Sequence, residues 1–190
     1  YLGNNFVCVP LICRTEFGND ESIVIWRKKT DGSYDYDFAT FDRYLDLLTR
    51  HCKIKVVSAQ VYFGGGWFTV DPAKRAVSVT VVDSAGKRTM VELPHYGTEE
   101  AKKLWKPLMD QLQERLKTKG LIGTLVLGIG HCGGIHKDVI AFFRDIAPGV
   151  GWHIAKHNRA QPNEFPQNRY VEWMYVPEDL PVPSPLPKSV

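Results

Sequence analysis

Two adjacent carboxylates, Asp20 and Glu21, are candidates for acid and base chemistry. They follow an apolar segment of strand composition, and the preceding Gly18 and Asn19 favour a turn. Neighbouring carboxyl groups can have their pKa values driven apart, which gives one proton donor and one ionised partner. The same acids would also suit a plain turn or the first turn of a helix. The pair is therefore a catalytic candidate with a structural alternative.

An aromatic and glycine-rich segment follows the second predicted strand, with Tyr62 and Trp67 on either side of Gly64–Gly66. An aromatic ring beside open backbone is a suitable platform for the apolar face of a sugar. The glycines could instead bind phosphate, but a predicted hairpin follows them rather than the start of a helix, which disfavours that reading. Core packing of Trp67 is the other alternative. We predict that Tyr62 and Trp67 bind carbohydrate.

Polar residues also follow the first, third and fourth predicted strands. His131 follows the third strand, His157 and Asn158 follow the fourth, and Glu16 lies in the first loop. Side chains at these places converge on the mouth of a barrel, so we predict that they bind substrate. Ordinary structural roles are the alternative for His131 and His157. No spacing of His, Asp and Glu matches a metal site, so neither a metal nor another cofactor is expected. His153 lies within a strand and is expected to be a hydrogen-bonded core residue.

Strands and amphipathic helices must position these residues. The predicted strands cover residues 6–13, 53–62, 124–130 and 151–156. The predicted helices cover residues 38–51 and 98–120 and a segment that contains 139–146. Between the second strand and the second helix, two alternating segments at 76–82 and 88–93 predict a β-hairpin.

This alternation of strands and helices indicates right-handed parallel crossovers, which form either a barrel or an open doubly wound sheet. A complete barrel needs about 250 residues and eight strands, whereas the chain has 190 residues and four predicted strands. The fold is then an open layer or half of a barrel. Because half a barrel has unpaired edges, we expect the remainder of the barrel or another chain to pair along the first or the last strand.

Composition indicates one globular domain, with 44% hydrophobic and 24% charged residues. The 24 Lys and Arg residues and the 21 Asp and Glu residues are spread along the chain, so no nucleic-acid or membrane partner is expected. Periodicity is lost near residue 160, and prolines accumulate after it. We therefore predict a domain at residues 1–160 and an irregular Pro-rich tail or linker at 161–190.

A series of short motifs resembles a known family. The motifs are TEFGNDES at 15–22, YDF at 36–38, FDRYLD at 41–46, YGT at 96–98, LWKPL at 104–108 and LGIG at 127–130. In their order they resemble the barrel domain of uncharacterised bacterial proteins similar to glycoside hydrolase family 123, the β-N-acetylgalactosaminidase-like group. The resemblance extends from about residue 7 to residue 152.

The resemblance implies an α/β fold, here a partial (β/α)8 TIM-type barrel with four parallel strands, crossover helices and one hairpin excursion. It also implies a substrate-assisted retaining mechanism, in which a Glu is the general acid and a neighbouring Asp orients the acetamido group of the substrate. That group attacks the anomeric carbon in place of an enzyme nucleophile. Carried onto this sequence, the resemblance makes Glu21 the acid and Asp20 its partner.

Three functional hypotheses remain open. The first is a glycoside hydrolase acting on a glycan that contains N-acetylhexosamine, and a polymeric substrate of this kind would favour export. The second is a non-catalytic carbohydrate-binding or scaffolding barrel, in which Tyr62 and Trp67 hold the glycan and the acids are structural. The third is a small doubly wound module that binds a phosphate ligand at Gly64–Gly66.

Overall fold

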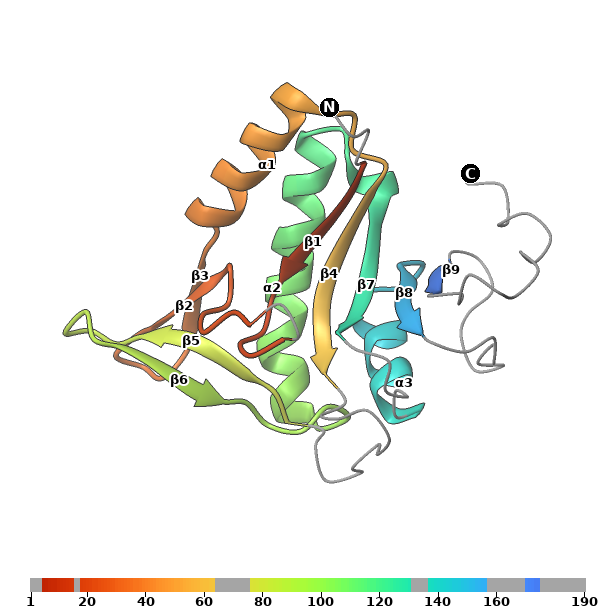
Figure 1. Cartoon of the computed structure of the whole chain (residues 1–190). Coiled ribbons are helices and arrows are strands. Elements are labelled where there is room, and N and C mark those ends of the chain that lie inside the picture. Colours follow the sequence, from red (N-terminus) through yellow and green to blue (C-terminus); the bar gives the residue numbers. More distant parts are fainter. Residues whose placement is uncertain (1–4, 16–17, 64–75, 131–136, 157–169, 175–190) are drawn as a thin grey trace.

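The computed structural model describes residues 5–15, 18–63, 76–130, 137–156 and 170–174. Its larger sheet has five strands in the order β1-β4-β7-β8-β9, and all four pairings are parallel. These strands are β1 (Phe6–Pro10), β4 (Val56–Phe63), β7 (Leu125–Gly130), β8 (Gly151–Lys156) and β9 (Tyr170–Met174). Because the strands are parallel, their carboxyl ends lie along one edge, which is the lower edge in Figure 1.

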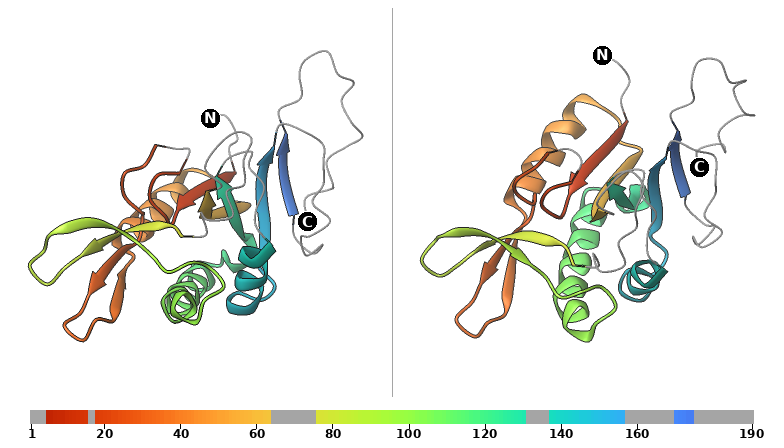
Figure 2. Two further views of the ribbon diagram at one scale, coloured as in Figure 1. Left: turned by 90° about the horizontal axis from the view of Figure 1, so that it is seen from below. Right: turned by 60° about the horizontal axis from the view of Figure 1, so that its bottom comes forward.

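The described helices connect neighbouring strands of this sheet. They are α1 (Ala39–His51), α2 (Glu99–Thr118), α3 (Lys137–Ile146) and the short 3-10 helix η1 (Ile122–Thr124). Right-handed crossovers between successive neighbours place the long helices on the same face, and Figure 2 shows α2 and α3 side by side. None of the described helices is both long enough and apolar enough to cross a membrane.

A second sheet of four strands lies beside the first, in the order β3-β2-β5-β6. Its strands are β2 (Ile25–Lys28), β3 (Tyr34–Asp37), β5 (Ser78–Val82) and β6 (Arg88–Glu92). Two antiparallel hairpins, β2–β3 and β5–β6, join through the parallel pair β2–β5. In Figure 1 this mixed sheet extends to the lower left, away from β8 and β9.

Aromatic packing fixes the mixed sheet to α2. The rings of Trp26 and Trp105 meet edge to face at 5.8 Å, and both side chains are buried. The Tyr36 hydroxyl donates a hydrogen bond to the backbone oxygen of Leu104 at 2.5 Å. The two sheets therefore share one hydrophobic core that runs through α2.

The structure confirms an α/β fold with the four predicted parallel strands and their crossover helices. Three expectations need correction. The first strand ends at Pro10, where the chain bends into a loop that returns to the Pro10 backbone oxygen through the N–H of Ile23. The hairpin at 76–93 is half of a mixed sheet rather than an isolated excursion. Residues Tyr170–Met174, within the segment expected to be irregular, form β9.

The described strands form an open sheet and do not close into a TIM-type barrel. At one edge, β9 of the same chain pairs along β8. At the other edge, β1 pairs with β4 and has no second neighbour among the described residues. The partial barrel and the boundary at residue 160 therefore stay predictions.

Candidate functional site

The loop after β1, residues 11–24, bends sharply before its two acids. Gly18 has φ +69°, a backbone conformation that glycine adopts without strain. At the centre of the loop, the Asn19 amide donates to the backbone oxygens of Ile12 at 2.8 Å and Glu21 at 2.9 Å. Its oxygen accepts from the backbone N–H and the hydroxyl of Thr15. The predicted bend at residues 18–19 is therefore present, and the Asn19 side chain holds it.

Buried hydrogen bonds tie the end of this loop to β5 in the mixed sheet. The Ser22 N–H donates to the Thr80 hydroxyl, and the Thr80 N–H donates to the Ser22 hydroxyl, each at 2.9 Å. The Cys13 thiol lies 3.5 Å from the same Thr80 hydroxyl. Burial raises the pKa of this thiol, so Cys13 stays protonated at neutral pH. The loop is thus anchored on both sides of its acidic pair.

The two acids themselves are exposed. Glu21 faces β6, where its Oε2 lies 2.8 Å from Nη1 of Arg88, and the two side chains are 50% and 58% exposed. An exposed pair of this kind contributes roughly 0–1 kcal/mol to stability. The loop therefore presents Asp20 and Glu21 to solvent at the carboxyl edge of the parallel sheet, with Glu21 held by a residue distant in sequence.

Tyr62 is part of the hydrophobic core. A β-bulge between Gln60 and Tyr62 places Tyr62 opposite Ile129, and the side chain is only 1% exposed. The hydroxyl of Tyr96 donates to the backbone oxygen of Val61 in the bulge at 2.5 Å. This environment favours core packing, and the role of Tyr62 in sugar binding stays a prediction. The other predicted binding residues lie outside the described residues: Glu16, Trp67, His131, His157 and Asn158.

A buried polar chain that the sequence analysis did not predict crosses the parallel sheet. Its members are Ser58 and Gln60 of β4 and His153 of β8, which are 0%, 1% and 6% exposed. The Gln60 amide donates to the Ser58 hydroxyl at 2.9 Å, and this hydroxyl lies 3.0 Å from Nδ1 of His153. The sequence signal was the pair of polar residues two apart in an otherwise apolar strand, which places both on one face.

Desolvation lowers the pKa of His153 to about 4, so its imidazole is neutral at neutral pH. The Ser58 hydroxyl accepts from Gln60 and has its own proton left to donate to Nδ1 of His153. The prediction that His153 is a hydrogen-bonded core residue is confirmed.

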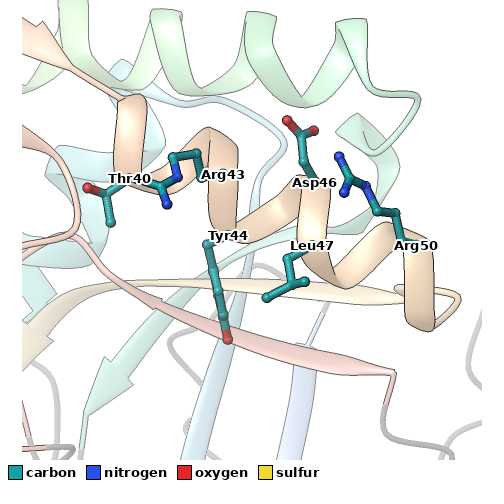
Figure 3. A pocket seen from close by; sticks show the side chains of 6 residues that line it. All are labelled: Thr40, Arg43, Tyr44, Asp46, Leu47 and Arg50. Atoms are coloured by element: carbon teal, nitrogen blue, oxygen red, sulfur yellow. The ribbon is translucent and has the colours of Figure 1, made fainter.

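The outer surface of α1 has a shallow hollow of about 570 Å³. Figure 3 shows Tyr44 and Leu47 pointing to the same side of the helix, while Asp46 points to the other. The lining residues, none of which is a predicted site residue, are Thr40, Arg43, Tyr44, Asp46, Leu47 and Arg50. Among the described residues, no group of three or more His, Cys, Asp or Glu side chains is placed to hold a metal ion.

Comparisons with known proteins agree with this architecture. The chain is similar in structure to a family 123 glycoside hydrolase from Clostridium perfringens, whose description concerns glycolipid glycan hydrolysis, with a TM-score of 0.58 and 13% identity. The match covers 80% of this chain and 27% of that protein, and at this identity it shows the fold alone. No curated protein matches the chain. The family model for the glycoside hydrolase 123 catalytic domain matches residues 6–180, and the chain therefore belongs to this family.

Proposed function

We propose that this chain forms part of a glycoside hydrolase that cleaves glycans containing N-acetylhexosamine by a substrate-assisted retaining mechanism. Membership of the family 123 catalytic domain supports hydrolysis of a glycosidic bond. The observation that supports a site at residues 20–21 is the anchored loop, which presents two adjacent carboxylates at the carboxyl edge of a parallel sheet. Chemistry in parallel α/β folds occurs at this edge.

In the proposed reaction, the Glu21 carboxyl gives its proton to the glycosidic oxygen as the bond to the anomeric carbon breaks. The acetamido oxygen of the substrate forms the new bond to that carbon, while Asp20 accepts a hydrogen bond from the acetamido N–H. Water then attacks the anomeric carbon and gives its proton to the Glu21 carboxylate, which restores both the substrate group and the acid. For this cycle, Glu21 must exchange its contact with Arg88 for the glycosidic oxygen.

A non-catalytic carbohydrate-binding module is the second candidate. The ion pair between Glu21 and Arg88 favours it, because a carboxylate held by a guanidinium on a neighbouring strand has a sufficient structural role. In this reading the acids keep the loop and the mixed sheet together, and other residues bind the glycan. The two candidates differ in whether Glu21 affects turnover or only stability.

The deciding experiment measures hydrolysis of p-nitrophenyl N-acetyl-β-galactosaminide by the native protein and by its Glu21→Gln variant. General acid catalysis predicts a loss of turnover of about 10²–10⁴-fold with sugar binding retained. Glu92→Gln, the same change at an exposed position of β6, is the matched control and should leave turnover unchanged. Arg88→Gln removes only the ion pair and should also leave the reaction intact.

The binding module predicts the reverse pattern. Glu21→Gln and Arg88→Gln would then cause the same small loss of stability, and neither would change glycan binding. Trp67→Ala would weaken binding in a protein that does not hydrolyse the substrate. This outcome would replace the hydrolase proposal.

The proposal also concerns how the open parallel sheet is completed. We infer that the open sheet is part of a (β/α)8 barrel, completed by a further segment of the polypeptide or by another chain pairing along β1. The supporting observation is that β1 has one strand neighbour among the described residues. Intact mass and light scattering of the native protein test this inference, and hydrogen exchange reports which β1 amides are protected. A 21.6 kDa monomer in which only the β1 amides that face β4 are protected would contradict it.

A further inference from the structure

The two faces of the parallel sheet differ in chemistry. In β4, the face that packs on the helices is apolar, with Val57, Ala59 and Val61 in the hydrophobic core. The opposite face has the buried polar chain of Ser58, Gln60 and His153 instead. Strands of a parallel sheet that are buried on both faces are normally apolar on both. A polar chain at such positions is costly to bury and needs a reason beyond packing.

A glycine allows this chain to cross the sheet. Ser58 and Gln60 belong to β4 and His153 to β8, and β7 runs between these strands. Gly128 of β7 is in register with both Gln60 and His153. A Cβ atom at Gly128 would lie 2.1 Å from the Gln60 Nε2 and 2.5 Å from the Ser58 hydroxyl. Only glycine leaves room for the two side chains to meet above β7.

The polar chain leaves one buried acceptor unused among the residues that the structure describes. Among the described residues, the buried Gln60 Oε1 has no hydrogen-bond partner, a state that is unfavourable in a folded protein. At the other end, Nδ1 of the neutral His153 imidazole lies 3.0 Å from the Ser58 hydroxyl. A group that donates a hydrogen bond, such as a hydroxyl, would satisfy the Gln60 Oε1.

The backbone of Gln60 adjoins the loop with the acids. Gln60 is in register with Pro10, the last residue of β1. The backbone oxygen of Gln60 accepts from the N–H of Leu11, where the loop begins, and the loop returns to Pro10 through the N–H of Ile23. The polar chain and the acidic pair therefore share one strand end.

We propose that Gln60 is a carbohydrate-binding residue whose Oε1 accepts a hydrogen bond from a sugar hydroxyl, with Ser58 and His153 as the positioning residues that hold its amide. The identity of the ligand rests on the proposed glycosidase function, whereas the site itself does not require turnover. An ordered water is the competing occupant of the same oxygen. The two occupants differ in whether added sugar changes the environment of Gln60.

The test uses N-acetylgalactosamine, N-acetylglucosamine, galactose and glucose as probes in calorimetric titrations of the native protein. Gln60→Met keeps the length of the side chain and removes the acceptor, and it should weaken binding of the preferred sugar about tenfold. Gln113→Met makes the same change on α2, where the amide donates to the Met109 backbone oxygen. This control should bind like the native protein.

A second measurement does not depend on the folding of a variant. In the native protein, the side-chain amide resonances of Gln60 should shift as the sugar is added. The inference would be overturned if sugar binds without shifting the Gln60 amide resonances and the Gln60→Met variant binds it equally well. Only water would then occupy the oxygen, and the proposed hydrolase would remain intact. Binding without hydrolysis would contradict the hydrolase and keep the inference. No binding of any probe would contradict both.

Discussion

The parallel sheet and the mixed sheet are stabilised in different ways. In β4 every residue between the two ends is buried, whereas β6 has four exposed residues out of five. The parallel sheet depends on packing and on one buried polar chain. The mixed sheet adds surface ion pairs to its aromatic contacts, such as Arg27 with Asp37 and Lys29 with Asp35. The loop with the candidate acids joins a buried region to a more exposed one.

This difference predicts where the protein is sensitive to substitution. A change in the shared core should affect both sheets, and a change in the buried polar chain should affect the parallel sheet. A change in the surface pairs should have little effect on the fold. The loop from residue 11 to residue 24 is anchored in both sheets, so its acids should keep their positions unless the junction itself is lost.

The largest effect is expected at the junction. Trp105 contacts Trp26 of the mixed sheet at 5.8 Å, Tyr96 at 5.5 Å and Phe143 of α3 at 5.8 Å. Trp105→Ala should therefore lower the free energy of unfolding by about 3–5 kcal/mol in denaturant titrations. Lys106→Ala, at the exposed neighbouring position, is the control and should change it little. Two separate unfolding transitions in the native protein would show that the sheets fold independently.

A smaller effect is expected on acidification. The pKa of His153 is about 4 in the folded protein and about 6.5 when unfolded, because burial disfavours the charged form. Its contribution to stability is full above pH 6.5, falls as the unfolded chain takes up the proton, and is lost below about pH 4. The loss amounts to about 3 kcal/mol. His153→Asn, which keeps an acceptor and does not titrate, should remove this part of the pH dependence; an unchanged profile would contradict it.

Gly128→Ala should destabilise the parallel sheet by about 1–3 kcal/mol, because the new methyl group overlaps the Gln60 amide and the Ser58 hydroxyl. Gly123→Ala is the matched control, since a Cβ at Gly123 meets nothing within 4 Å. Thermal unfolding compares the two variants. Adding Gln60→Ala to Gly128→Ala should recover part of the loss, and the absence of any recovery would place the clash elsewhere.

The smallest effect is expected in the mixed sheet. Arg88→Gln breaks the exposed pair with Glu21 and should cost about 1 kcal/mol or less. The difference between native protein and variant should shrink further at 1 M salt, where screening is strong. A loss of several kcal/mol in the free energy of unfolding, or a loss that salt does not change, would contradict this expectation. The mixed sheet would then depend on this ion pair as strongly as the parallel sheet depends on its buried side chains.

The sequence predicted the elements whose residues carry a local pattern. The helix expected at 98–120 is α2, Glu99–Thr118, with Thr98 accepting at its start from the N–H of Ala101. The strand expected at 151–156 is β8. By contrast, β2 and β3 have four residues each and alternate only weakly between buried and exposed. β3 pairs with β2, and β2 pairs with β5, which comes much later in the chain and which no local pattern reveals.

The candidate site was predictable to the same limited extent. The acidic pair and the bend before it follow from neighbouring residues, and both are present. The contact of Glu21 with Arg88 joins residues 67 positions apart, and the meeting of Ser58 with His153 joins residues 95 apart. Such contacts depend on the order of the strands, and the amino-acid pattern alone did not determine that order.

The bulge in β4 has a consequence for changes in chain length. Up to Gln60 the side chains of β4 alternate regularly, and the extra residue at Val61 reverses the alternation so that Tyr62 points into the core. Deleting Val61 would restore the alternation and would exchange the faces of Tyr62 and Phe63. A one-residue deletion at this point would thus rearrange the strand end more severely than most substitutions, although it would leave every side chain before it in place.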